Sequence, residues 1–512
     1  MEVFQEVLSS LTQPFNLIYM IFGVAAGMIV GALPGLTATM AIAVMLPFTF
    51  SMPPDTALIT LGGIYIGAIF GGCIAAILIN TPGTPSSIAT TFDGYPMTQQ
   101  GKPDQALVTA AVSSGIGGVI GGLALLFLTP MLAALALQFG PPEFFWIALL
   151  GLTMVATLSS GSLLKGLIGG SIGLLLSTVG LAPIGGDSRF TFGFSQLQAG
   201  FELIVMLIAF FCIPQVIRMI KNQSNTKEQV KPFQSQKGVI GYVFKQIFMR
   251  PFLILRSAVI GIIVGIIPGA GGNVASLLSY DATVRMSKDQ STFGKGDVRG
   301  VSASEGANNA EVGGSLVPLL ALGIPGAPPA AVIIGALLMQ GIQPGPNLFE
   351  ENANLIYTFI TAFILANVVM LILALFGSKY IGRVINIPTY YLAPAIVFLT
   401  IIGSYAIRNN FTDVVTLIII GLIGYVLSER GFAPAPIVLG LILGPIAEEG
   451  LAQSILISEG FFSLLGLFFT RPITLVLMLF CILSLLSPYI GKLLKSQKAK
   501  EEQEKEEAEE SL

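Results

Sequence analysis

Residues 27–42 read GMIVGALPGLTATMAI, and residues 261–276 read GIIVGIIPGAGGNVAS. Seven of the sixteen aligned positions are identical, among them Pro34 with Pro268 and Gly35 with Gly269. Because proline cannot donate a helical hydrogen bond, each copy predicts a break inside an otherwise apolar helix. Duplicated broken helices in two halves of a membrane protein are the best sequence indication of a transport site.

The composition places the chain in a membrane. Of its 512 residues, 54% are hydrophobic and only 10% are charged, whereas soluble domains carry about 25% charged residues. Long apolar runs recur from end to end and predict an all-α polytopic membrane protein with about 10–14 spans. Several runs are shorter than a full crossing, so we expect some of them to form re-entrant hairpins.

A second pair of breaks follows the first pair. The first half continues with TPGTP at residues 81–85, and the second half continues with IPGAP at residues 324–328. Each half therefore holds two breaks in the same order, which predicts two hairpins per half that meet near the middle of the membrane. We expect inverted repeats, because inversion gives alternating access by symmetry. The alternative, a parallel repeat, depends on the parity of the spans between the halves.

The charge pattern divides the chain into four parts. These are a first transmembrane half (1–220), a basic linker (221–251), a second transmembrane half (252–491) and a charged tail (492–512). Between Lys221 and Arg256 there are seven Lys or Arg residues and one acid, Glu228. Cytoplasmic loops are enriched in Lys and Arg, so we expect the linker and the tail to be cytoplasmic.

The sequence lacks the motifs of several enzyme classes. It contains no histidine, which removes a Ser-His-Asp triad and a His-Glu-x-x-His zinc site, and it has no phosphate-binding loop of the ATPase type. We expect no enzyme, no cofactor and no nucleic-acid partner, but transport driven by a Na⁺ or H⁺ gradient. Two rivals are an intramembrane hydrolase that uses Asp187 with a second acid, and a passive anion channel.

The breaks provide the candidate substrate site. Backbone groups freed inside a membrane cost several kcal/mol each unless protein, water or a ligand pairs with them. Freed amides at a helix N-terminus suit a carboxylate, and freed carbonyls suit Na⁺. The alternative is that these small residues only permit close helix packing. The candidates for substrate binding are Pro34, Gly35, Thr37, Thr39, Thr81, Pro82, Gly83, Thr84, Ser86, Pro268, Gly269, Gly272, Asn273, Pro325 and Gly326.

A second group of residues is the candidate ion site, with Na⁺ expected at the same loops. Its members carry an acid, amides and a hydroxyl, and they are Asn80, Ser87, Glu305, Asn308 and Asn309. The last three share one helical face at i, i+3 and i+4, and Glu311 follows them. The alternative is a solvated loop at a helix N-terminus.

Three other charged residues have simpler interpretations. Lys295 and Arg299 could attract an anionic substrate, but we favour cytoplasmic-face charges under the positive-inside rule. Asp93 lies in the run TFDGYP, which predicts a turn and a structural role.

Six stretches carry a resemblance to a known family. They are residues 31–37, 63–87, 93–96, 265–269, 293–296 with 305–310, and 323–326. In these stretches, which span most of the chain, the sequence closely resembles the large membrane subunit of tripartite tricarboxylate transporters, the TctA family. It departs from the family pattern at Ser304, where Pro is common, and at Gly306, where Ala is common.

The resemblance implies partners and a substrate class. Such subunits work with a small membrane subunit of about four helices and a periplasmic solute-binding protein. Together they import a carboxylate across the bacterial inner membrane, typically with a Na⁺ or proton gradient. The binding protein selects the substrate first, so the resemblance names no particular carboxylate.

Overall fold

The computed structural model describes residues 2–159, 162–182, 184–221, 238–387, 389–458 and 460–487. The central part of the predicted basic linker (222–237) and the predicted charged tail (492–512) lie outside these residues. The chain forms two compact units, which are Met1–Gln138 with Phe201–Glu429 (unit 1) and Phe139–Gly200 with Arg430–Leu512 (unit 2). All four Pro-Gly breaks lie in unit 1, and the predicted division at 221–251 stays a prediction.

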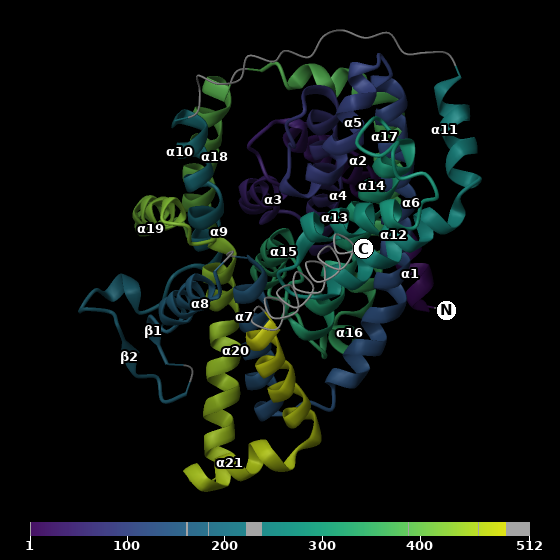
Figure 1. Ribbon diagram of the computed structural model, residues 1–512. Helices are drawn as coiled ribbons and strands as arrows, with labels where there is room; N and C mark the ends of the chain where they lie inside the picture. Colours follow the sequence, from purple (N-terminus) through teal and green to yellow (C-terminus); the bar gives the residue numbers. More distant parts are fainter. Residues whose placement is uncertain are drawn as a thin grey trace, which may run out of the picture. The chain divides into compact units, whose positions relative to one another are not determined.

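The regular elements among the described residues of unit 1 are all helices (Figure 1). Its first segment holds α1 (Glu2–Leu11), α2 (Pro14–Ala32), α3 (Ala38–Met45), η1 (Leu46–Thr49), α4 (Pro54–Ile79), η2 (Pro85–Ser87), α5 (Ile88–Gln99) and α6 (Pro103–Ala136). Its second segment holds α9 (Leu203–Phe211), α10 (Ile213–Lys221), α11 (Val239–Phe248), α12 (Pro251–Ile266), α13 (Gly271–Arg285), α14 (Val298–Leu322), α15 (Pro328–Met339), α16 (Leu348–Glu351), α17 (Ala353–Val384), α18 (Thr389–Arg408) and α19 (Phe411–Glu429).

The described residues of unit 2 form five α-helices and a small hairpin. Its elements are α7 (Pro141–Ser159), α8 (Leu163–Ser177), β1 (Gly180–Leu181), β2 (Ser188–Arg189), η3 (Ser195–Leu197), α20 (Pro434–Ser458), α21 (Phe461–Thr470) and a further helix, Pro472–Ser487. The strands pair antiparallel, with Gly180 opposite Arg189. Glu143 is fully buried here, and its carboxylate accepts hydrogen bonds from Arg471 (2.6 Å) and Thr474 (2.7 Å), which ties α7 to the last helix pair.

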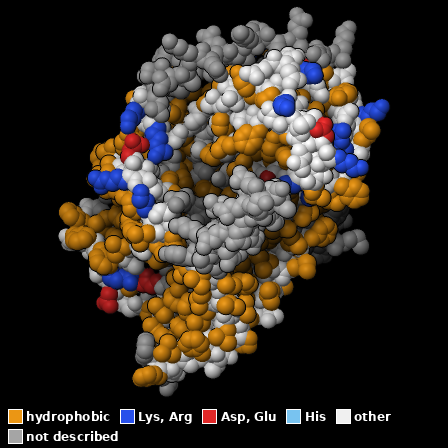
Figure 2. Space-filling model, viewed as in Figure 1, with side chains coloured by type: hydrophobic (Ala, Val, Ile, Leu, Met, Phe, Trp, Pro, Cys, Tyr) orange, Lys and Arg blue, Asp and Glu red, His pale blue; other side chains and the backbone are white. Residues whose placement is uncertain are grey.

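The expected polytopic helical fold is confirmed. Eight helices of the described residues are long and apolar enough to cross a membrane, or up to 10 if each of two bent helix pairs is one span. One bent pair is α11 with α12, at 78°. Eight is below the predicted 10–14 spans and ten is their lower limit, because several apolar runs form short or broken helices. Figure 2 shows broad hydrophobic surfaces, with the charged side chains gathered in small groups, as expected for a chain whose solvent is largely lipid.

Two helices form the centre of unit 1, and each belongs to one copy of the repeat. α4 packs on α2, and α14 packs on α12 and α6. Every residue of α4 from Thr56 to Ile79 is buried, and so is every residue of α14 from Gly300 to Ala321. The sequence repeat is therefore also a repeat of packing. In each half, the helix before the first break packs against the helix before the second break.

The two copies have the same backbone geometry at their first break. α2 ends before Leu33 (φ −84°, ψ 115°), and α12 ends before Ile267 (φ −82°, ψ 111°). The glycines two positions later, Gly35 and Gly269, have φ of +90° and +84°. Only glycine adopts this region at no steric cost, which explains the second letter of each Pro-Gly pair.

Glycines also allow the backbones of the paired helices to touch. A Cβ on Gly31 would lie 2.1 Å from the carbonyl oxygen of Ala68, and one on Gly265 would lie 2.5 Å from that of Glu311. These two contacts are equivalent, because Gly31 aligns with Gly265 and because Ala68 and Glu311 lie at the same distance before the second breaks.

Replacing either glycine with alanine is expected to separate the helix pair. Gly31→Ala and Gly265→Ala should each lower the free energy of unfolding by about 1–3 kcal/mol, because a buried methyl group would meet backbone atoms that cannot rotate away. Thermal unfolding in detergent measures the loss. Gly241→Ala in α11 is the matched control, since no atom of the other described residues outside its own helix backbone lies within 4 Å of its added Cβ. An equal effect at all three positions would contradict this packing.

Candidate functional site

The four breaks adjoin in pairs. We call Pro34-Gly35 break 1, Pro82-Gly83 break 2, Pro268-Gly269 break 3 and Pro325-Gly326 break 4. The amide of Gly83 donates to the carbonyl of Gly72 on α4 (3.1 Å), and the amide of Gly326 donates in the same way to Ser315 on α14 (3.1 Å). Break 4 also contacts break 3 directly, because the Gly269 amide donates to the Gly326 carbonyl (2.9 Å).

The ends of α4 and α14 complete the correspondence between breaks 2 and 4. α4 ends at Asn80 and α14 ends at Gly323, and both of these residues are in the left-handed region, with φ of 54° and 73°. Asparagine is one of the few other residues that adopt this conformation. Asn80 is exposed, so its described role is to end a helix, and the predicted ion-binding role is not tested.

The short helices after the breaks pack across the two halves. α3, after break 1, packs on α15, which follows break 4. α13, after break 3, packs on η2 and α5, which follow break 2. Exchanging the two halves converts one pairing into the other. This relation holds for inverted and for parallel repeats, so the predicted inversion stays a prediction.

A buried polar segment of α14 lies beside the second of these pairings. Glu305, Asn308 and Asn309 are 0% exposed, and Glu311 is 1% exposed. α14 packs on α5, α6, α12 and α13. The alternative of a solvated loop is therefore wrong for this segment. A polar sequence had favoured solvent, but α14 is enclosed by neighbours from both halves.

The carboxylate of Glu305 is paired with hydroxyl groups. Thr90 on α5 donates to its Oε1 (2.5 Å), and Ser114 on α6 donates to its Oε2 (3.0 Å). The Thr90 hydroxyl also lies 3.2 Å from the Ser304 hydroxyl. Glu305 thus links α14 to two helices of the first half. The sequence analysis missed Thr90 and Ser114 because neither lies near Glu305 in the chain.

Five other side-chain atoms of this segment have no hydrogen-bond partner among the residues that the structure describes. Within the described residues, neither the oxygen nor the nitrogen of the Asn308 and Asn309 side chains has a hydrogen bond, and neither does Glu311 Oε1. A buried polar group without a partner costs about 1–3 kcal/mol in proteins. Three such side chains within four residues of one helix indicate a place where a ligand, an ion or water supplies the bonds.

Backbone from break 3 reaches this place. A Cβ on Gly272 would lie 2.7 Å from Asn308 Oδ1 and 3.3 Å from Glu311 Oε2, with the Ser86 Cβ at 2.9 Å. Gly272 is therefore required for the approach of α13 to α14. The structure brings together two of the predicted substrate-binding residues, Ser86 and Gly272, and one of the predicted ion-binding residues, Asn308. We call Ser86, Gly272, Asn308 and Glu311 the break 2–3 cluster.

The hydroxyls after break 2 form their own network. Thr84 Oγ1 lies 3.1 Å from Ser86 Oγ and 3.0 Å from Ser87 Oγ, and all three residues are buried. A Cβ on Gly72 would lie 2.2 Å from Thr84 Oγ1, so the network rests on the face of α4. This places Ser87 next to the break 2–3 cluster through Ser86.

Other predicted site residues lie elsewhere. Thr37 caps α3 by accepting from the Met40 amide (3.2 Å), and Thr39 is buried within α3, in the other pairing. Thr81 is half-buried and donates to the Ile79 carbonyl (3.3 Å). Asn273 is exposed, because it lies one residue beyond Gly272 and points away from the cluster.

Asp93 does not form the expected turn. α5 continues through it, and its buried carboxylate accepts from the amides of Gly296 (2.9 Å) and Asp297 (2.8 Å) and from the Tyr280 hydroxyl (2.9 Å). Burial raises the pKa of Asp93, while these hydrogen bonds oppose that shift. The expected structural role is met in another way: Asp93 fastens α5 to the loop before α14.

Arg299 is held at the start of α14 and does not point into the cluster. Its guanidinium pairs with Asp297 (2.5 Å) and lies over the Phe293 ring (4.7 Å). Burial alone would raise the pKa of Asp297, but hydrogen bonds from Arg299 and Thr292 lower it. This ion pair favours the interpretation of Arg299 as a charge at the cytoplasmic face over a role in attracting an anionic substrate.

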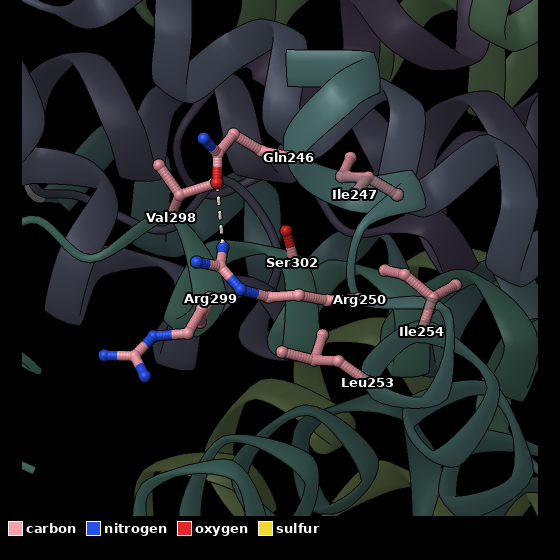
Figure 3. Close-up of a pocket in the computed structure, with 8 residues that line it drawn as sticks. All are labelled: Gln246, Ile247, Arg250, Leu253, Ile254, Val298, Arg299 and Ser302. Carbon is pink, nitrogen blue, oxygen red and sulfur yellow. Dashed lines mark hydrogen bonds between the residues drawn. The ribbon is translucent and has the colours of Figure 1, made fainter. Parts of the chain in front are cut away.

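A small pocket lies where the bend between α11 and α12 meets the start of α14. In Figure 3, Arg250 extends toward Gln246 (3.0 Å), and the guanidinium of Arg299 points away from it. The pocket has about 10 Å³ of free volume, which is enough for one water molecule. It is too small for a carboxylate substrate.

Comparison with known proteins identifies the family. The sequence pattern of the tripartite tricarboxylate transporter TctA family matches residues 17–439. The chain belongs to the TctA family. It is therefore the large subunit of a tricarboxylate transporter, and the expected resemblance is confirmed. TctA is a transporter family, in agreement with the expectation of no enzyme, and Asp187 of the hydrolase alternative is an exposed residue between β1 and β2.

Two relatives of this TctA chain come from Agrobacterium vitis. An uncharacterized 52.8 kDa protein in the TAR-I ttuC' 3' region is 39% identical over 481 residues, which cover 93% of this chain and 94% of the relative. An uncharacterized protein in the TAR-II ttuC' 3' region is 40% identical over 233 residues, which cover 45% of this chain and 95% of the relative. No solved structure matches the chain.

Removing a hydroxyl that pairs with Glu305 is expected to weaken this TctA subunit. Thr90→Val should lower the free energy of unfolding by about 1–3 kcal/mol, because one carboxylate oxygen would stay buried without a donor. Thr91→Val, whose hydroxyl bonds only the carbonyl of Ile88 in its own helix, should change it by less than about 0.5 kcal/mol. Thermal unfolding compares them. Equal effects of the two substitutions would show that the hydrogen bond from Thr90 to Glu305 does not stabilise the fold.

Proposed function

We propose that this chain imports a carboxylate across the bacterial inner membrane by ion-coupled alternating access. A periplasmic solute-binding protein delivers the carboxylate, and a small four-helix membrane subunit completes the transporter. The coupling ion is Na⁺ or H⁺. The observation that carries the proposal is that the helices after breaks 2 and 3 pack together beside buried polar groups for which the described residues provide no hydrogen-bond partner.

The charges of the described residues support a site of this kind. No Lys or Arg side chain of these residues is buried, so a carboxylate at the breaks relies on backbone amides, hydroxyls and a bound cation. The positive end of a half-helix attracts an anion in low-dielectric surroundings. Net charge at the site stays low when the anion and a cation are carried together.

The arrangement of the breaks also supports alternating access. Each cross-half contact joins a helix after one break to a helix after another, and the two contacts are equivalent on exchange of the halves. Two equivalent pairings of helices can separate alternately, because each conformational change in one half has an equivalent in the other half. A passive anion channel has no need of a buried acid next to such breaks.

Uptake into proteoliposomes tests this function. The chain is reconstituted with its two partners, and uptake of labelled citrate, and then of a panel of di- and tricarboxylates, is measured. We expect saturable uptake that falls by about tenfold or more when ionophores dissipate both the Na⁺ and the H⁺ gradient, since the gradient supplies the driving force. Glu351→Gln, an exposed acid in α16, is the control. Undiminished, non-saturating flux without either gradient would contradict coupling and favour a channel.

A further inference from the structure

We infer that the coupling ion is a monovalent metal cation, Na⁺, and that it binds in the break 2–3 cluster, with Glu311 and Asn308 as its side-chain ligands. This inference rests on the proposed function and gives its coupling ion a place. It also separates the two buried acids of α14, since Glu305 is a positioning residue and Glu311 is a ligand.

Geometry brings an oxygen of Glu311 and an oxygen of Asn308 to one place. Glu311 Oε2 and Asn308 Oδ1 both lie within 3.3 Å of one point, the position of a Cβ on Gly272. Asn308 Oδ1 and Glu311 Oε1 have no hydrogen bond within the described part of the chain. An acceptor oxygen that no donor reaches is suited to a cation, and both side chains are at least 99% buried.

The composition of the cluster favours a monovalent cation. It offers the carboxylate of Glu311, the amide oxygen of Asn308 and the hydroxyl of Ser86, while both oxygens of Glu305 already accept hydrogen bonds. No group of three or more His, Cys, Asp or Glu residues that could hold a metal occurs among the residues that the structure describes. Divalent cations usually take more charged oxygen ligands, whereas one carboxylate balances one positive charge.

The first half lacks this site at the equivalent positions. Gly265 contacts Glu311 of α14, and the equivalent Gly31 contacts Ala68 of α4. Ala68 therefore corresponds to Glu311, and by the same alignment Tyr65 corresponds to Asn308. Ala38 follows break 1 where Gly272 follows break 3. A methyl group is accommodated at Ala38, but at Gly272 it would meet Asn308 Oδ1 at 2.7 Å. The cluster is therefore specific to the second half.

Glu305 acts through the helices that it joins. Its hydrogen bonds from Thr90 and Ser114 hold α5 and α6 against α14, and α5 follows directly from η2, which carries Ser86. Glu305 thereby positions the segment after break 2 relative to Asn308. Both of its own oxygens accept hydrogen bonds, so it does not act as a ligand of the ion. Its substitution should change the stability of the fold more than the affinity for the ion.

Binding of radioactive Na⁺ to the purified full chain in lipid nanodiscs tests the site. Choline chloride keeps the ionic strength constant, and no substrate is present. We expect saturable binding to the wild type, and a loss of affinity of about tenfold or more in Glu311→Gln and in Gly272→Ala. The added Cβ of Gly272→Ala would also lie 2.9 Å from the Ser86 Cβ, so thermal unfolding checks that this variant is folded, and Glu311→Gln tests the site without that change in packing. Gly241→Ala and Glu351→Gln are the matched controls and should bind like the wild type.

Three outcomes would overturn the inference. They are no saturable Na⁺ binding to the wild type, wild-type affinity in Glu311→Gln, and a loss of affinity in Glu305→Gln as large as that in Glu311→Gln. Gradient-independent uptake in the proteoliposome assay would instead contradict the proposed function, and it leaves these binding results to decide the site by themselves.

Discussion

The architecture of unit 1 depends on one constraint: backbone groups freed inside an apolar bundle must find partners. Each break exposes amides and carbonyls, and the chain pairs them with the neighbouring helix, as in the bonds from Gly83 to Gly72 and from Gly326 to Ser315. Those bonds need backbones at contact distance, which the glycines at 31 and 265 provide. Because the same solution occurs in both copies, the packing repeats with the sequence.

The polar segment of α14 is the exception to that rule. The glycine amides of breaks 2, 3 and 4 are paired. By contrast, Asn308, Asn309 and one oxygen of Glu311 are buried without a hydrogen-bond partner among the described residues. Natural proteins leave buried polar groups unpaired rarely, and they do so mostly where function requires it. α14 belongs to a TctA chain, so the missing partners fit a transporter whose ligands enter and leave between the two halves.

The breaks could be predicted from the sequence, but the residues that surround them in the fold could not. Proline and glycine act locally, so Pro34 and Gly35 could be interpreted without tertiary information, and Leu33 and Ile267 do have the same backbone geometry. The partners of Glu305 are different, because Thr90 and Ser114 are about two hundred positions away and no local pattern marks them. The role of Glu311 likewise depends on the approach of Gly272, which only the fold reveals.

Two expectations show how tertiary packing overrides local signals. Asp93, Gly94 and Pro96 favour a turn, but α5 continues through them because the carboxylate bonds the loop before α14. Asn273 follows a break, as a ligand should, yet it is exposed. Successive helical residues point about 100° apart, so contact at Gly272 directs its neighbour away from the cluster.

The central claim is that the unpartnered groups of α14 face a ligand. An experimental density map of the chain in NaCl, at a resolution that shows ordered ions, tests it most directly. We predict a feature within coordination distance of Glu311 and Asn308 that disappears when choline replaces Na⁺. A map in which Asn308, Asn309 and Glu311 bond only to one another or to the surrounding helices, with nothing between α13 and α14, would contradict the account.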